Sequence, residues 1–366
     1  MTVLSRHPRT IQLAKDLGLS IRGDCLAHIR QHALAKADKI VSDAPVPADS
    51  LERFRRLVAD KYRARVEFIY EDSDVGRISS SYPSFHTGLA ARLNQEFLND
   101  TTEGLTLERD EWDPRVFRYL AVIDARGTRA SRAYFTAWHE ITHLVLHPEQ
   151  LPFPGFRRTP TSEEIEKDPL ESVVDHVAGR LGFFRTLFSP ILREAITQND
   201  GTVCFRAFDS ARAAIKPEPS LFSTAMGSIE LLPEPMLLVE AALAYKKSEA
   251  RELRSAQASF DFARPSPKAV LRVVKAVSNE AARNSSLAIH PNMRVPQASV
   301  LTAAFENAGE IELTAVEDQG SWETRSEGAL PTLPLRVEAI RRGRYVYGLI
   351  GIAPRTAVAR KGRQAK

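Results

Sequence analysis

The chain has 366 residues, a formal net charge of +4, and 43% hydrophobic and 26% charged residues. This length exceeds one typical hydrophobic core and predicts two or three domains of an ordinary globular protein. No apolar run reaches the roughly 20 residues that a membrane-spanning helix needs. The stretch Met1 to Ser20 has no apolar signal-peptide core, and Cys25 and Cys204 form no paired motif. We therefore expect a cytoplasmic protein without a membrane span.

Basic residues gather in two clusters, which could bind phosphate backbones. The interpretation we favour is a solvated helix face and a disordered tail, so nucleic acid is a weakly supported partner. The clusters comprise Arg53, Arg55, Arg56, Lys61, Arg63 and Arg65, and Arg341, Arg342, Arg344, Arg355, Arg360, Lys361, Arg363 and Lys366.

The first part of the chain predicts a mixture of helices and strands. Helical spacing of apolar residues predicts helices over 8–40, 49–62, 131–146 and 169–188. Alternating β-branched and aromatic residues predict strands over 64–70 and 116–124. We expect loops over 76–87, 98–113 and 148–169, and either a strand or a short helix over 87–97.

One part of the predicted helix over 131–146 carries metal-binding chemistry. His139-Glu140-x-x-His143 places two imidazoles about one helical turn apart, so that both can face one metal ion. Glu140 lies on the adjacent edge of the helix, where it can take a proton from a metal-bound water. Apolar residues fill the opposite face, as a buried active-site helix requires.

A catalytic zinc site usually has three protein ligands and one water, so a third ligand is needed. His147 would place a third imidazole along the same helix, which would make a row of about 12 Å. It also precedes a proline, so we interpret it as a structural or supporting residue. A metzincin has histidine where this chain has Glu149 and glycine where it has Leu146, which excludes that class.

Glu171 is the third ligand that we predict. It lies on the helix over 169–188. The loop before that helix is long enough to let it fold back beside the helix over 131–146. Asp175 follows one turn later, where its carboxylate can accept an imidazole N–H and so fix the tautomer of a ligand. His176 is an alternative that faces elsewhere. Zinc is the expected metal, and Mn²⁺ or Fe²⁺ would also suit two imidazoles and a carboxylate.

The remainder of the chain is predicted to form a helical middle region, a separate α+β module and a basic tail. The middle region, 201–262, is expected to be helical and to include a long amphipathic helix over 237–254. A helix over 267–284 and strands over 294–300, 310–316, 335–340 and 345–352 predict a separate α+β module at 263–353. The basic tail at 354–366 is expected to be disordered. The predicted fold class is therefore α+β, and its first domain, at 1–200, carries the His-Glu-x-x-His motif.

The segment from Trp138 to His147, paired with the segment from Glu171 to Ala178, resembles the ImmA/IrrE family of bacterial metallopeptidases. The resemblance covers about residues 50–190, and the Glu171-x-x-x-Asp175 spacing is also that of gluzincins. It implies a zincin-like metallopeptidase domain in which two histidines and Glu171 bind the metal and Glu140 activates water. Members of this family cleave helix-turn-helix repressors and so switch on genes. Those linked to radiation and desiccation responses carry a helical middle region and a GAF-like sensor domain.

These observations lead to one main hypothesis and two rivals. The main hypothesis is a zinc-dependent endopeptidase that cleaves a protein partner, a transcriptional repressor, in a stress-response or derepression pathway. In this mechanism an oxyanion would need a further donor, for which Tyr134, His176, Arg180 and Arg185 are candidates. The first rival is a metal-binding transcriptional regulator that binds its partner or DNA without proteolysis. The second is a nucleic-acid-binding protein that uses the basic clusters.

Overall fold

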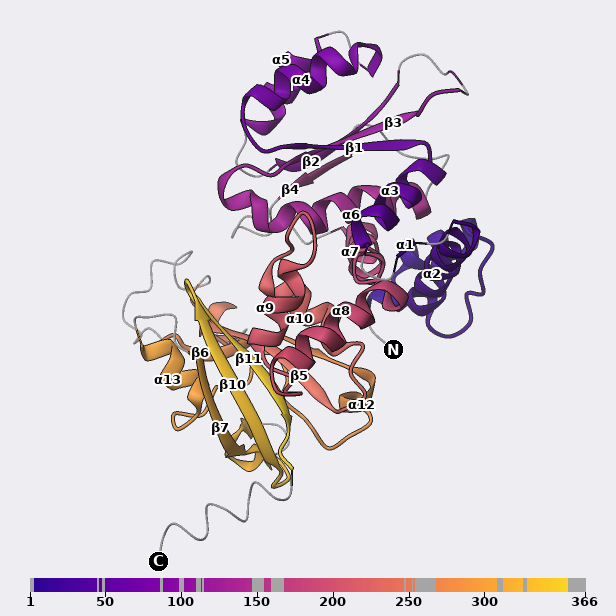
Figure 1. Cartoon of the computed structure of the whole chain (residues 1–366). Coiled ribbons are helices and arrows are strands. Elements are labelled where there is room, and N and C mark those ends of the chain that lie inside the picture. Colours follow the sequence, from indigo (N-terminus) through magenta and orange to yellow (C-terminus); the bar gives the residue numbers. More distant parts are fainter. Residues whose placement is uncertain are drawn as a thin grey trace, which may run out of the picture. The chain divides into compact units, whose positions relative to one another are not determined.

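A computed structural model of the chain divides into two compact units (Figure 1). The first comprises residues 1–198 and 209–224, and the second comprises residues 199–208 and 225–366. The structure describes residues 3–44, 46–47, 50–85, 88–98, 102–109, 113, 115–146, 155–158, 168–246, 248–251, 253, 268–307, 312–324 and 328–354.

The first unit begins with helices, where one long helix was predicted over 8–40. After a short 3-10 turn at Leu4–Arg6, α1 spans Pro8–Asp16 and α2 spans Cys25–Asp43. The prediction of one uninterrupted helix is wrong because the chain turns between them, with Gly18 at φ 68° and Gly23 at φ 84°. Glycine adopts this left-handed backbone without steric penalty. The predicted helix over 49–62 is confirmed as α3, Leu51–Lys61.

A four-stranded sheet forms the centre of this unit. Its strands are β1 (Ala64–Ile69), β2 (Thr102–Glu108), β3 (Tyr119–Asp124) and β4 (Gly155–Arg158), in the order β1-β3-β2-β4. β1 runs parallel to β3, whereas β2 is antiparallel to both β3 and β4. The two predicted strands are confirmed as β1 and β3. The loops predicted over 98–113 and 148–169 instead contain β2 and β4, which sequence analysis missed.

Helices cover both faces of this sheet (Figure 1). On one face lie α4 (Ser73–Ser81) and α5 (Leu89–Phe97), which share a hydrophobic core with the sheet. The loop predicted over 76–87 is therefore wrong in part, because apolar side chains of α4 pack on the sheet, and a 3-10 turn follows at Pro83–Phe85. Of the two alternatives for 87–97, the helix is the one observed. On the other face lie α3 and α6 (Ala130–Leu146), and α6 confirms the predicted motif helix.

The predicted helix over 169–188 is divided into two. α7 spans Pro169–Gly182 and α8 spans Arg185–Gln198. Asp168 caps α7 by accepting a hydrogen bond from the Leu170 backbone N–H at 2.9 Å. Pro169 occupies the first helical position, where the fixed φ of proline matches the helical backbone. The next helices, α9 (Phe205–Ala213) and α10 (Leu221–Ile229), each contain residues of both units.

The second unit is built on an antiparallel sheet in the order β6-β5-β11-β10-β7. The helices predicted over 237–254 and 267–284 are wrong in large part, because 236–244 forms β5 and 270–278 forms β6, whereas 248–251 and 280–283 are helical. β5 is buried along most of its length, so it lacks the polar alternation that identifies a half-exposed strand. The strands are β5 (Met236–Ala244), β6 (Val270–Ser278), β7 (Glu312–Asp318), β10 (Pro334–Arg342) and β11 (Tyr345–Ile352).

Short elements complete this unit. α12 (Glu280–Arg283) and α13 (Val300–Glu306) contribute to a hydrophobic core on one face of the sheet, and β8 (Glu323–Thr324) pairs with β9 (Gly328–Ala329). The strand predicted over 294–300 is reduced to one isolated bridge between Arg294 and Arg272. The other three predicted strands are confirmed as β7, β10 and β11.

The α+β class is thus confirmed. Of the tail predicted to be disordered, residues 355–366 lie outside the described residues. None of the described helices is long and apolar enough to cross a lipid bilayer.

Candidate metal centre

The position of α6 is set by the turn that follows β3. Asp124, the last residue of β3, is buried and pairs with the guanidinium groups of Arg126, at 2.8 Å, and Arg129. Gly127 in this turn has φ 53°, in the left-handed region. On the next turns of α6, Ala133 and Ala137 pack against Ile123 of β3. One apolar side of the helix therefore lies on the sheet, and its other sides remain available for polar residues.

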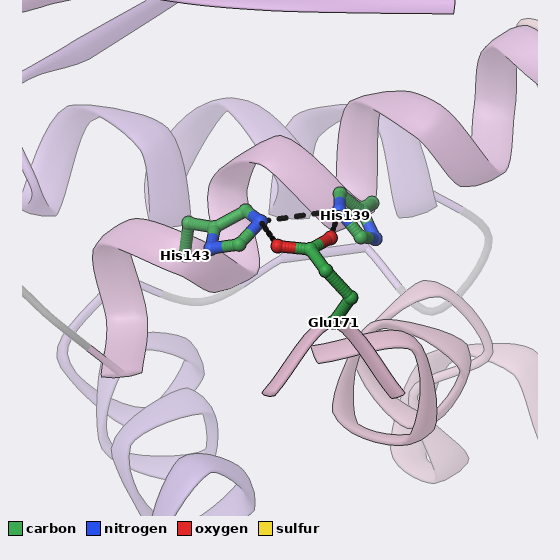
Figure 2. A group of neighbouring side chains, drawn as sticks. All are labelled: His139, His143 and Glu171. Atoms are coloured by element: carbon green, nitrogen blue, oxygen red, sulfur yellow. Dashed lines mark hydrogen bonds and ion pairs between the residues drawn. The ribbon is translucent and has the colours of Figure 1, made fainter. Parts of the chain in front are cut away.

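Two histidines project from the same side of α6 (Figure 2). His139 is buried, with 2% of its side chain exposed, whereas the side chain of His143 is 18% exposed. Their Nε2 atoms are 3.1 Å apart. The predicted i, i+4 spacing therefore does bring both imidazoles to one point, as the helical repeat requires.

Glu171, in the first turn of α7, meets both histidines (Figure 2). One of its carboxylate oxygens lies 3.0 Å from Nε2 of His139, and the other lies 3.5 Å from Nε2 of His143. α7 can approach α6 closely because Gly182 has no side chain: a Cβ there would lie 3.1 Å from the Trp138 ring. Packing of the two helices thus brings together residues that are distant in the sequence.

The spacing of these donors fits a metal ion. Two ligands about 2.0–2.1 Å from a tetrahedral zinc are about 3.3 Å from each other. The separation of the two imidazole nitrogens, 3.1 Å, lies close to this value, and the two oxygens of Glu171 lie 3.0 and 3.5 Å from the imidazoles, one oxygen to each. With one ligand atom taken from each residue, the three atoms lie within 4.8 Å of one another. Among the described residues, His139, His143 and Glu171 form the group of metal-ligating side chains that is close enough to hold one ion. Three protein donors leave one position for water or a substrate, as in catalytic rather than structural zinc sites.

The site is partly open to solvent on the side of Glu171. Exposure of the side chains rises from His139 through His143 to Glu171, at 2%, 18% and 37%. Burial favours a higher pKa for the Glu171 carboxyl, but hydrogen bonds from the two imidazoles outweigh it and hold the pKa well below its usual range. Glu171 is therefore ionised at neutral pH, as a metal ligand must be.

Asp175 supports the buried histidine from behind. Its Oδ1 lies 2.8 Å from Nδ1 of His139. When Nδ1 donates its proton to this carboxylate, Nε2 carries a lone pair that points toward Glu171 and His143. The structure therefore brings Asp175 to the position that the sequence predicted.

Replacing Asp175 with Asn is expected to weaken zinc binding by about 10- to 100-fold, the usual effect of losing such a partner. The amide cannot supply the negative charge that fixes the tautomer of His139. Competition with a chromophoric chelator measures the affinity. His176→Asn is the matched control, because His176 is exposed and lies outside the metal-ligating group. Equal affinities for the wild type and Asp175→Asn would contradict this role for Asp175.

Glu140 lies on a different side of α6 from the histidine pair and faces β2. It is 2% exposed, and its Oε2 accepts a hydrogen bond from Oγ1 of Thr106 at 2.5 Å. A Cβ on Gly104 would lie 3.3 Å from Oε1 of Glu140. Thr106 and Gly104 were missed because a loop was predicted over 98–113. The alternation of apolar Leu105 and Leu107 with polar neighbours was the signal that could have identified this strand.

The other candidates that the structure describes do not join the group. His147 and Glu149 lie outside the described residues. The hydroxyl of Tyr134 is buried and donates to the backbone carbonyl of Gly182, so it is already occupied and is a poor oxyanion donor. Arg180 is half-buried on α7 and Arg185 is exposed at the start of α8, and neither belongs to the metal-ligating group.

No protein-family model matches the chain, and a search of the curated proteins finds no match. The functional assignment therefore depends on the residues of the site. Those residues are an imidazole pair on α6, a carboxylate on α7 and a buried glutamate next to the first histidine.

Proposed function

We propose that this protein is a zinc-dependent endopeptidase of the ImmA/IrrE type that cleaves a protein partner. The observation that carries the proposal is the convergence of His139, His143 and Glu171 at separations that suit one metal ion. Glu140, which follows His139 directly in the sequence, supports an enzyme rather than a structural metal site, because a structural site has no use for a base. The class of partner, a helix-turn-helix repressor, comes from the resemblance of the two motif segments.

The residues divide the chemical work. A zinc ion held by the triad would polarise the scissile carbonyl and lower the pKa of a bound water to about 7. Glu140 takes the proton of the attacking water and passes it to the nitrogen of the leaving amine. Asp175 keeps Nε2 of His139 available as a ligand. The substrate enters from the partly exposed side, next to Glu171 and His143.

We also propose that the second unit is the sensor module of this regulator. Its β5-β11-β10 centre and its one-sided hydrophobic core make it a folded α+β module in its own right, as a sensor domain requires. The pathway that follows is cytoplasmic: a signal reaches the protein, a repressor is cut, and its genes are derepressed.

The test uses the full-length protein loaded with zinc and purified repressors encoded by neighbouring genes. We expect a discrete pair of fragments, detected by electrophoresis and mass spectrometry, with the wild type. Protein stripped of metal by a chelator should give no fragments, and returning zinc should restore them. A proteome-derived peptide library, incubated in parallel, widens the range of substrates. Tight zinc binding without any cut in either probe would contradict proteolysis and favour the non-proteolytic, metal-binding regulator.

A further inference from the structure

The side of β2 that faces α6 is polar, in contrast to the apolar contact between β3 and α6. Arg132, Thr136 and Glu140 are spaced four residues apart and so form one row along α6. Arg132 and Thr136 contact the carboxylate of Glu103, at 2.5 and 3.4 Å. The next residue of the row, Glu140, accepts the hydrogen bond of Thr106. Two successive contacts therefore fix the position of β2 along the helix before the strand reaches Glu140.

An irregularity in β2 makes this arrangement possible. The pairing register between β2 and β4 shifts between Thr102 and Gly104, so Glu103 is an extra residue in the strand. Such a bulge re-aims a side chain and is common beside active sites. Here Glu103 and Gly104 both lie against α6, whereas Leu105 and Leu107 join the core on the opposite face.

The two oxygens of the Glu140 carboxylate have different surroundings. Oε2 receives the one proton that the Thr106 hydroxyl can donate. Oε1 lies beside Gly104, where a methyl group would be 3.3 Å from Oε1 and only 2.7 Å from Cγ2 of Thr136. Glycine therefore leaves the space that the carboxylate occupies, and the threonine fixes its rotation. A terminal carboxylate torsion is otherwise broad, so without this bond the group could turn between orientations.

We infer that Thr106 is a positioning residue for the base: by holding Oε2, it leaves Oε1 of Glu140 as the atom that takes the proton from water. This inference rests on the proposed endopeptidase function and adds to it a residue of β2 that does not touch the metal ligands. Loss of the hydroxyl lets the carboxylate rotate, so fewer enzyme–substrate complexes have the base in the reactive orientation. A misplacement of about 1 Å can lower a rate by up to about a hundredfold.

Val replaces Thr with nearly the same shape, which makes Thr106→Val the main variant. We expect kcat to fall by about tenfold to a hundredfold, with KM and zinc content close to wild type. The melting temperature should fall as well, because the buried Oε2 of Glu140 loses its donor. Thr106→Ser keeps the hydroxyl and should restore most of kcat. Thr102→Val is the matched control: Thr102 is equally buried on the same strand, but its hydroxyl has no hydrogen-bond partner among the residues that the structure describes. If Thr106→Val does not fold, Thr106→Ala carries the same test.

The assay measures initial rates on the repressor or library peptide that the wild type cuts, per molecule of folded, zinc-loaded enzyme. A thousandfold excess of chelator gives the background. Equal kcat for Thr106→Val and Thr102→Val would overturn the positioning role and leave the proposed function intact. A wild type that cuts neither the repressors nor the peptide library would overturn the proposed function and the positioning role together. A kcat for Thr106→Ser as low as that for Thr106→Val would also reject the role assigned to the hydroxyl.

Discussion

Replacing Glu140 with Gln is expected to lower kcat by about 10²- to 10⁴-fold, the range that a general base contributes. Gln has the same shape, and its amide oxygen can still accept the hydrogen bond of Thr106, so the fold should persist. It cannot take a proton from water. The metal ligands are untouched, so the variant should bind one equivalent of zinc with wild-type affinity. Rates on a cleaved repressor and zinc titration measure the two properties on one sample.

A second glutamate provides the control for this substitution. Glu67 on β1 is also largely shielded, with 13% of its side chain exposed, and it pairs with Arg65 and Arg77 rather than with the site. Glu67→Gln should leave kcat within about twofold of the wild type, since it removes only ion pairs to half-exposed arginines, which contribute little, and keeps an acceptor for the Tyr82 hydroxyl. Full cleavage by Glu140→Gln would contradict the assignment of the base. Loss of zinc from that variant would instead assign Glu140 a structural role in the site.

The metal-ligating group could be predicted from the sequence because its geometry is largely local. His139 and His143 share one helix, and the helical repeat alone brings them together. Asp175 follows Glu171 on α7 by the same rule. The prediction still required α7 to fold back beside α6, which spacing alone could not determine. Close packing at Gly182 is the tertiary contact that achieves it.

The support for Glu140 could not be predicted, because it depends on pairing between distant segments. Thr106 reaches α6 only when β2 pairs with β3 and a bulge shifts its register. Neither feature has a local signature. The same limitation explains the errors at β5, which is largely buried, and at β6, which is partly buried, because their runs of aliphatic residues resemble those of a helix. In each of these cases the sheet, and not local propensity, decides the structure.

A buried glutamate in the second unit predicts an unusual dependence of stability on pH. Glu338 on β10 is 1% exposed, and its Oε1 accepts a hydrogen bond from the backbone N–H of Phe205 at 2.8 Å. Burial raises the pKa of Glu338 to about 7; the Phe205 hydrogen bond opposes this, and the neighbouring Glu312 adds to it. Arg336 is the nearest cation, at 3.7 Å, which is too far for a hydrogen bond.

The sign of the effect follows from the two pKa values. In the unfolded chain Glu338 should titrate near its ordinary pKa of 4.5, and in the folded unit near 7. Between these values the unfolded chain has lost its proton and the folded unit retains it, so the free energy of unfolding falls as pH rises. The total loss is about 3 kcal/mol, at about 1.4 kcal/mol for each pKa unit. Glu338→Gln stays neutral at every pH and should lack this loss, so it should be the more stable protein above pH 7.

The two buried cysteines allow each unit to be followed separately in the full chain. Cys204 belongs to the second unit and Cys25 to the first, and both are buried. Pulsed alkylation in increasing urea, with each rate divided by that of the unfolded thiol at the same pH, reports when each becomes exposed. Between pH 4.5 and 7.5, the urea midpoint for Cys204 should fall in the wild type relative to Glu338→Gln, whereas the midpoint for Cys25 should be the same in both. Parallel pH profiles for Cys204 in the two proteins would show that Glu338 ionises normally in the fold. Its burial beside Phe205 and Glu312 makes the opposite result the expected one, because an ionised carboxylate there would be shielded from solvent and would face a second carboxylate, with Arg336 beyond hydrogen-bond distance.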